Sequence, residues 1–66
     1  MIDIDNIRIG DRVLHRLYGA GVVLDMLPIS GDIILTIEFD SGKKKKLCAL
    51  VSKLEPEIQV NEQGKE

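Results

Sequence analysis

Residues 32–48 read DIILTIEFDSGKKKKLC, and this stretch decides the fold. Up to residue 39, apolar side chains recur at every second position, which is the period of a strand with one buried face. Asp, Ser and Gly at 40–42 favour a tight turn, because aspartate and glycine tolerate the left-handed backbone of a short hairpin. Residues 43–48 then return as a strand. The side chains predicted to face the core from the first strand are Ile33, Leu35, Ile37 and Phe39.

Two further strands are expected before this hairpin. Residues 11–16 alternate, with Val13 and His15 on one face, and residues 21–29 form a longer apolar run. Ser, Gly and Asp at 30–32 predict a tight connection from this run into the hairpin. The side chains of the second run expected to reach the core are Val22, Leu24 and Met26.

The segment after the hairpin completes the predicted fold. Residues 49–52 suit a single helical turn, and residues 53–55 suit a short closing strand that brings Leu54 to the core. Short strands with regularly spaced turn signals favour an all-β fold, here a small five-stranded antiparallel SH3-like barrel. Closing the sheet avoids two open edges. The expected core consists of Val13, Val22, Leu24, Leu35, Ile37, Phe39, Leu47 and Leu54.

The length of 66 residues supports one domain. We expect a loose N-terminal arm at 1–8, the barrel at 9–55 and a mobile acidic C-terminal tail at 56–66, because the tail is polar and has no periodicity. The net charge is −2, yet residues 8–54 carry eight Lys/Arg and only five Asp/Glu. A mildly basic body therefore lies between acidic ends, which affects the choice of partner rather than the fold.

The composition excludes several classes of protein. One cysteine and one histidine cannot form an internal disulfide or a tetrahedral Cys/His zinc site, so we expect no metal and no cofactor. No apolar run approaches a membrane span, and the acidic N-terminus is unlike a signal peptide. These features predict a cytoplasmic protein. Cys48 is expected to be a small buried hydrophobic residue.

Residues 15–23, HRLYGAGVV, resemble a phosphate-binding loop at first sight. A dinucleotide-binding loop needs a third glycine where Leu24 stands, followed by a helix. The residues that follow are β-branched and apolar, so no helix N-terminus is expected to hold a phosphate. We therefore interpret Gly19 and Gly21 as turn residues that need a positive φ or close packing under Tyr18.

No catalytic group of residues stands out in the sequence. His15 is the only histidine, and neither a nucleophile with a base nor a pair of carboxylates accompanies it. We expect His15 to face inward and to bond the backbone of the turn that follows. The chain is therefore not expected to be an enzyme.

The stretches GDRVLHRLYGAGVVL at 10–24 and IEFDSGKKKKL at 37–47 carry a family resemblance. With the closing Leu54 they resemble the C-terminal Tudor-like domain of UvrD/PcrA-type DNA helicases, and the small stand-alone bacterial proteins that share it. Val51 and Lys53 depart from the family pattern, where an aromatic residue and a proline are usual. The residues that match the pattern are Gly10, Asp11, Val13, His15, Tyr18, Gly19, Gly21, Phe39, Gly42, Lys45, Leu47 and Leu54.

The resemblance implies a Tudor-type barrel that acts as a docking module. It implies contact with RNA polymerase in transcription-coupled DNA repair, and with other repair proteins or DNA. It implies no ATPase or strand-separating activity, which belongs to motor domains. A stand-alone protein and an excised helicase domain both fit the resemblance.

The run Lys43–Lys46 is the most conspicuous candidate for a binding surface. The predicted partner-binding residues are Leu14, Arg16, Tyr18, Lys43, Lys44, Lys45 and Lys46. The alternative is weak, salt-dependent nucleic-acid binding through Arg12, Arg16, Lys43, Lys44, Lys45 and Lys46.

Two aromatic residues, Tyr18 and Phe39, are too few for stacking on bases or for an aromatic cage, so a protein partner is favoured. Separately, we expect the chain to be a monomer. The remaining interpretation of the lysine run is a solvated strand whose charges block aggregation. The chain would then be a spacer domain without a ligand.

Overall fold

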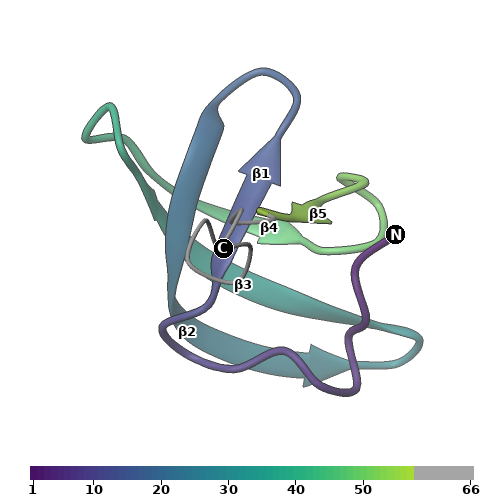
Figure 1. Cartoon of the computed structure of the whole chain (residues 1–66). Coiled ribbons are helices and arrows are strands. Elements are labelled where there is room, and N and C mark those ends of the chain that lie inside the picture. The colour runs from purple at the N-terminus through teal and green to yellow at the C-terminus, as the bar shows by residue number, and fades with distance from the viewer. Residues whose placement is uncertain (58–66) are drawn as a thin grey trace, which may run out of the picture.

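The computed structural model describes residues 1–57, which form one five-stranded antiparallel sheet that curls on itself (Figure 1). The predicted all-β, SH3-like barrel is confirmed. The order of strands across the sheet is β4-β3-β2-β1-β5, so β4 and β5 are its edges. The strands are β1 (Arg12–His15), β2 (Gly19–Ile29), β3 (Asp32–Phe39), β4 (Lys44–Cys48) and β5 (Glu55–Pro56).

The predicted hairpin of residues 32–48 is confirmed as β3 and β4. Leu35 is paired with Leu47 and Ile37 with Lys45, and the N–H of Phe39 donates to the carbonyl oxygen of Lys43 at 2.7 Å. Gly42 takes a φ of 102°, the left-handed conformation that the turn requires. The period-two pattern and the turn residues were therefore sufficient to place this element.

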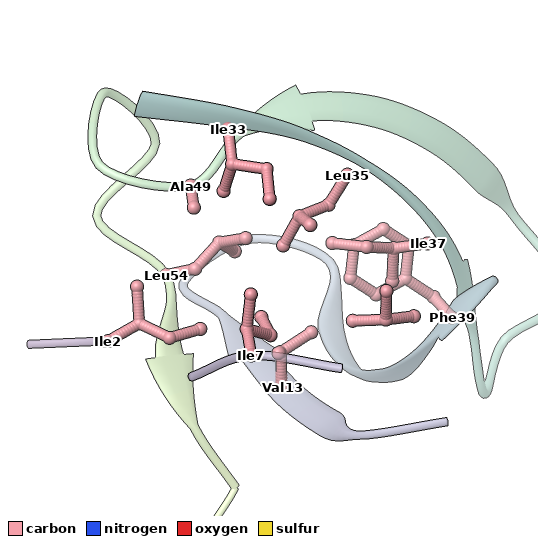
Figure 2. Close-up of a cluster of buried hydrophobic side chains, with 10 residues drawn as sticks. Ile2, Ile7, Val13, Ile33, Leu35, Ile37, Phe39, Ala49 and Leu54 are labelled. Carbon is pink, nitrogen blue, oxygen red and sulfur yellow. The ribbon is translucent and has the colours of Figure 1, made fainter. Parts of the chain in front are cut away.

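The core lies inside the curled sheet, where side chains of β3 meet those of β1 and of the loops (Figure 2). Five of the predicted core residues are fully enclosed, and Leu47 and Met26 pack against the cluster as half-buried neighbours. The confirmed core residues are Val13, Leu35, Ile37, Phe39 and Leu54.

The prediction that Val22 and Leu24 reach the core is wrong. Val23 is fully buried instead, while Leu24 is exposed. The register between β2 and β3 shifts between Val23 and Asp25, where a β-bulge inserts one extra residue. Before the bulge Val23 faces inward opposite Ile37, and after it Met26 faces inward, so the alternation changes phase inside one strand.

The N-terminal segment 1–8 is not a loose arm, contrary to expectation. Ile2 and Ile7 belong to the buried cluster, and Ile4 packs against it. Figure 2 shows Ile2 and Ile7 among the core side chains. The backbone N–H of Asn6 donates to the carbonyl oxygen of Asp3 at 3.2 Å and forms a turn between them. Burying these isoleucines adds apolar area to a core that a short chain can otherwise barely fill.

Residues 49–53 form turns and no helix element is present in residues 1–57, so the predicted single helical turn is found only as one i→i−4 bond, from the N–H of Ser52 to the carbonyl oxygen of Cys48 at 2.9 Å. Two further backbone bonds close the segment, from the N–H of Lys53 to the carbonyl oxygen of Leu50 and from the N–H of Leu54 to that of Ala49, both at 3.0 Å. The buried carboxylate of Asp32 also holds the segment, because it accepts the N–H groups of Leu50 at 2.9 Å and Val51 at 3.2 Å.

The closing strand lies slightly later than the predicted residues 53–55. It comprises Glu55 and Pro56, with Pro56 paired to Val13, and the N–H of Glu57 donates to the carbonyl oxygen of Arg12 at 3.1 Å. The first two residues of the predicted acidic tail are therefore fixed against β1. The remainder of that tail, 58–66, lies outside the described residues.

Candidate protein-docking surface

The turn between β1 and β2 is built around His15 at the end of β1. Its Nδ1 atom accepts the backbone N–H groups of Leu17 at 3.0 Å and Tyr18 at 3.2 Å. This confirms that His15 bonds the turn backbone. Because Nδ1 is an acceptor here, the neutral imidazole carries its proton on Nε2. His15 therefore fixes the conformation of the turn.

Gly19 has the positive φ expected of a turn glycine, whereas Gly21 lies within β2 and is closely packed against β3. Gly19 has a φ of 83°, so its backbone is left-handed. A Cβ atom at Gly21 would lie 2.8 Å from the carbonyl oxygen of Glu38 and within 2.9 Å of the side chains of Ile37 and Phe39. The close neighbours of Gly21 are thus on β3, and the glycine allows β2 to approach it.

Tyr18 joins this turn to the core and to the lysine strand. Its ring stacks on His15 with 4.6 Å between centroids, and lies 5.3 Å from the ring of Phe39. The Nζ atom of Lys45 lies 5.2 Å from the centroid of the Tyr18 ring, within the range of a cation–π contact. The structure therefore brings together two of the predicted partner-binding residues, Tyr18 and Lys45. Phe39 is 1% exposed and offers no aromatic face to a ligand.

The four lysines are all exposed, and their side chains alternate across the sheet. Lys44 lies opposite Glu38 and Lys46 opposite Thr36, on the outer face. Lys45 lies opposite the buried Ile37, so its side chain leaves from the inner face toward Tyr18. Within residues 1–57, the recorded ion pairs involve Arg12 and the N-terminus but no lysine. Within this part of the chain, no carboxylate therefore pairs with the four lysines.

Arg12 is not part of this free basic surface. Its Nη1 and Nη2 atoms donate to the two carboxylate oxygens of Asp40 at 3.0 and 2.7 Å, and its Nε atom donates to Glu57 at 2.7 Å. The bonds with Asp40, followed by those with Glu57, raise the pKa of Arg12 above its already high ordinary value. The same guanidinium lowers the pKa of Asp40. The predicted use of Arg12 as a phosphate contact therefore conflicts with the geometry, because all three of its nitrogens already donate to two carboxylates, which also offset its charge.

The remaining predicted partner-binding residues, Leu14 and Arg16, are both exposed but lie on different elements. Leu14 is exposed on β1, paired with Ala20 and Glu55, and β1 is separated from β4 by β2 and β3. Arg16 is exposed in the turn that also holds Tyr18. Leu14 is therefore not a neighbour of the lysines within the sheet, whereas Arg16 shares the turn of Tyr18.

In residues 1–57, no cluster of His, Cys, Asp or Glu is arranged to hold a metal ion. The same part of the chain contains no helix long and apolar enough to cross a bilayer. Cys48 is half-buried on β4 rather than buried as expected.

The fold and this surface define a small Tudor-type barrel with a basic edge strand. The family model of the PcrA/UvrD tudor domain matches residues 9–54. The chain belongs to that family, whose tudor domain is a helicase-associated interaction module. No curated protein matches the chain.

The sequence analysis did not predict the contacts that fix the segments around this surface. The bonds that Arg12 makes with Asp40 and Glu57 join positions far apart in the chain, and only the sheet brings them together. A sequence-level signal for Asp32 did exist, because an aspartate at a turn commonly accepts backbone N–H groups. The alternation of Ile and Asp at 2–5 was an equally readable sign of a packed segment.

Proposed function

We propose that the chain is a non-enzymatic protein-interaction module that docks on a component of the transcription or DNA-repair machinery, with RNA polymerase as the first candidate. The observation that carries this proposal is the exposed run Lys43–Lys46 beside Tyr18, with Lys45 over the tyrosine ring. Membership of the PcrA/UvrD tudor-domain family supports it. The chain acts as a monomer in the cytoplasm, where this machinery works in a bacterial cell.

A protein partner fits the surface better than a nucleic acid does. Arg12 is bound to two carboxylates, and Glu38 lies opposite Lys44 on the outer face, so the field around the lysines is mixed in sign. Single-stranded nucleic acids also require open aromatic faces for base stacking. Tyr18 carries Lys45 on its ring and Phe39 is buried. Weak binding of a duplex through Arg16 and the lysines is therefore the second candidate.

The only histidine also supports a non-enzymatic role. The Nδ1 atom of His15 is occupied by two backbone N–H groups, and its ring is stacked against Tyr18. A general base needs a free acceptor aimed at a substrate proton. His15 is therefore proposed to hold the turn that presents Tyr18.

A titration followed by NMR tests the proposal. Unlabelled fragments of bacterial RNA polymerase are added to the ¹⁵N-labelled chain, and the amide signals are followed. We expect the amides of Tyr18 and Lys43–Lys46 to shift in a saturable manner, while those of the turn at 30–31 stay in place. If no amide in the lysine strand moves at high fragment concentration, the polymerase proposal fails.

A further inference from the structure

β4 is an edge strand with no neighbour on its outer side among the described residues. The strand order is β4-β3-β2-β1-β5, and β4 pairs only with β3 in residues 1–57. An edge strand presents a row of unpaired N–H and C=O groups that another extended segment can use. Figure 1 shows β3 and β4 as the two arms of one hairpin, and β4 is the arm that contains the lysines.

The hydrogen bonds of the hairpin define which groups of β4 are free. The N–H of Phe39 donates to the carbonyl oxygen of Lys43 at 2.7 Å, and the N–H of Ala49 donates to that of Ile33 at 2.9 Å. In an antiparallel pair, every second residue directs its N–H and its C=O at the neighbouring strand, and the residues between them direct theirs away from it. The two bonds above show which residues of β4 belong to each set. Positions 43, 45, 47 and 49 therefore face β3, and the backbone groups of Lys44 and Lys46 point away from the sheet.

The free edge has a defined end. The carbonyl oxygen of Cys48 accepts the N–H of Ser52 at 2.9 Å, so the turn at 49–53 already uses it. The groups without a partner in residues 1–57 are the N–H and C=O of Lys44 and Lys46, together with the N–H of Cys48. Such a short edge can accept one short extended segment.

We propose that an extended, acidic segment of a protein partner adds to β4 as a further antiparallel strand. This inference rests on the proposed function and specifies how the same surface binds. Side chains of the added strand alternate between two environments. On the outer face they lie beside Lys44 and Lys46, and on the inner face beside Leu47 and the stem of Lys45. A segment that alternates carboxylates with apolar residues satisfies both faces.

The lysines select this occupant against a second copy of the chain. Pairing two β4 edges would place lysines opposite lysines, and like charges directly opposite each other destabilise a sheet. An acidic strand turns the same charges into attraction. The lysines thus prevent self-association and favour a partner of opposite charge.

The probe is a blocked peptide of alternating valine and glutamate, tested against the full chain. In the proposed register the glutamates lie opposite Lys44 and Lys46, so their backbone N–H groups point at β4 and those of the valines point away. Two analogues of this peptide are compared. In the first, the backbone nitrogens of the glutamates are methylated, and in the second, those of the valines are methylated. They have the same charge and the same number of lost donors.

We expect N-methylation of the glutamates to weaken binding about tenfold or more, since each lost hydrogen bond affects affinity by several-fold. N-methylation of the valines should change binding by less than about threefold. Hydrogen exchange at the amides of Lys44 and Lys46 should slow when the unmodified peptide binds. Equal binding of the two analogues, unchanged exchange at both amides, or no binding of the unmodified peptide would each overturn strand addition.

The outcome is separate from that of the polymerase test. If polymerase fragments shift the lysine amides but the two analogues bind equally, the docking function remains and strand addition is rejected. If the analogues differ as expected and no polymerase fragment binds, strand addition remains and the polymerase is rejected as the partner.

Discussion

Arg12 holds Asp40 through two hydrogen bonds of 3.0 and 2.7 Å, and this pair joins β1 to the turn that begins the lysine strand. The third contact of Arg12, with Glu57, fixes the chain as it leaves β5. One guanidinium therefore connects three segments that are distant in the sequence. The lysines follow directly after a turn whose position this contact restrains.

Arg12→Gln should lower the Tm by a few degrees, because it removes the charged contacts with Asp40 and Glu57, which lie at the partly exposed surface. Arg16→Gln is the matched control, since Arg16 is exposed and makes no ion pair within residues 1–57. Thermal unfolding followed by circular dichroism checks both variants. Equal melting of Arg12→Gln and the unmodified chain would show that these contacts do not stabilise the fold.

Asp32 should make stability dependent on acid pH. Its pKa is lowered chiefly by the N–H of Leu50, with smaller contributions from Ile33 and Val51, while burial acts in the opposite direction. Because the folded-state pKa lies below the unfolded one, this stabilisation is present above about pH 4 and is lost as the pH falls through the folded-state value. Asp32→Asn should therefore lower the Tm by several degrees at neutral pH, and by less in strong acid.

The measurement for Asp32 is the Tm between neutral and strongly acidic pH. Asp25→Asn is the control, because Asp25 is exposed on β2 and should leave the neutral Tm unchanged. A constant difference between Asp32→Asn and the unmodified chain at every pH would contradict the assigned role of the carboxylate.

Gly21→Ala should destabilise the fold by about 2 kcal/mol, since the new Cβ would overlap the backbone oxygen of Glu38, which cannot move freely. Gly31→Ala is a useful comparison, because Gly31 has no atom within 4 Å of an added Cβ and only its φ of 77° opposes the change. Its cost should be about 1 kcal/mol. Denaturant unfolding would contradict this account if Gly31→Ala were the more damaging of the two.

The β-bulge predicts different results for two neighbouring valines. Val23→Ala should cost about 2 kcal/mol, because Val23 is fully buried. Val22→Ala should cost less than about 1 kcal/mol, because Val22 is only half-buried and faces outward beside Arg12. Equilibrium unfolding of both variants checks the phase of β2, and the reverse order would place the bulge elsewhere.

The sequence predicted the parts of the fold that local rules control. The alternation in β3, the glycine turn before β4 and the inward position of Leu54 follow from periods and turn residues within a few positions. The bulge in β2 did not, because a run of consecutive apolar residues fits either phase until pairing with β3 selects one. The Ile/Asp alternation at 2–5 was a local sign that this segment packs, but the sequence did not show where Ile2 and Ile7 would be buried, since their position depends on the folded sheet.

The candidate site was also predicted only in part, because local patterns identify its residues but not their neighbours in the folded sheet. Lys43–Lys46 and the turn around Tyr18 are visible as runs and motifs in the chain. That Lys45 meets Tyr18 while Arg12 is held by Asp40 depends on which strands are neighbours. Sequence patterns therefore identified the charged residues, but the topology decides which charges are free.

The affinity of purified bacterial RNA polymerase for three forms of the chain tests the docking proposal most directly. These are the unmodified chain, the variant with Lys44→Glu and Lys46→Glu, and Lys53→Glu as an exposed control with one reversed charge outside β4. We predict measurable binding of the unmodified chain and of the control, and a loss of about tenfold or more for the double variant. Equal affinity of all three forms, or no binding by any, would contradict docking through the lysine strand.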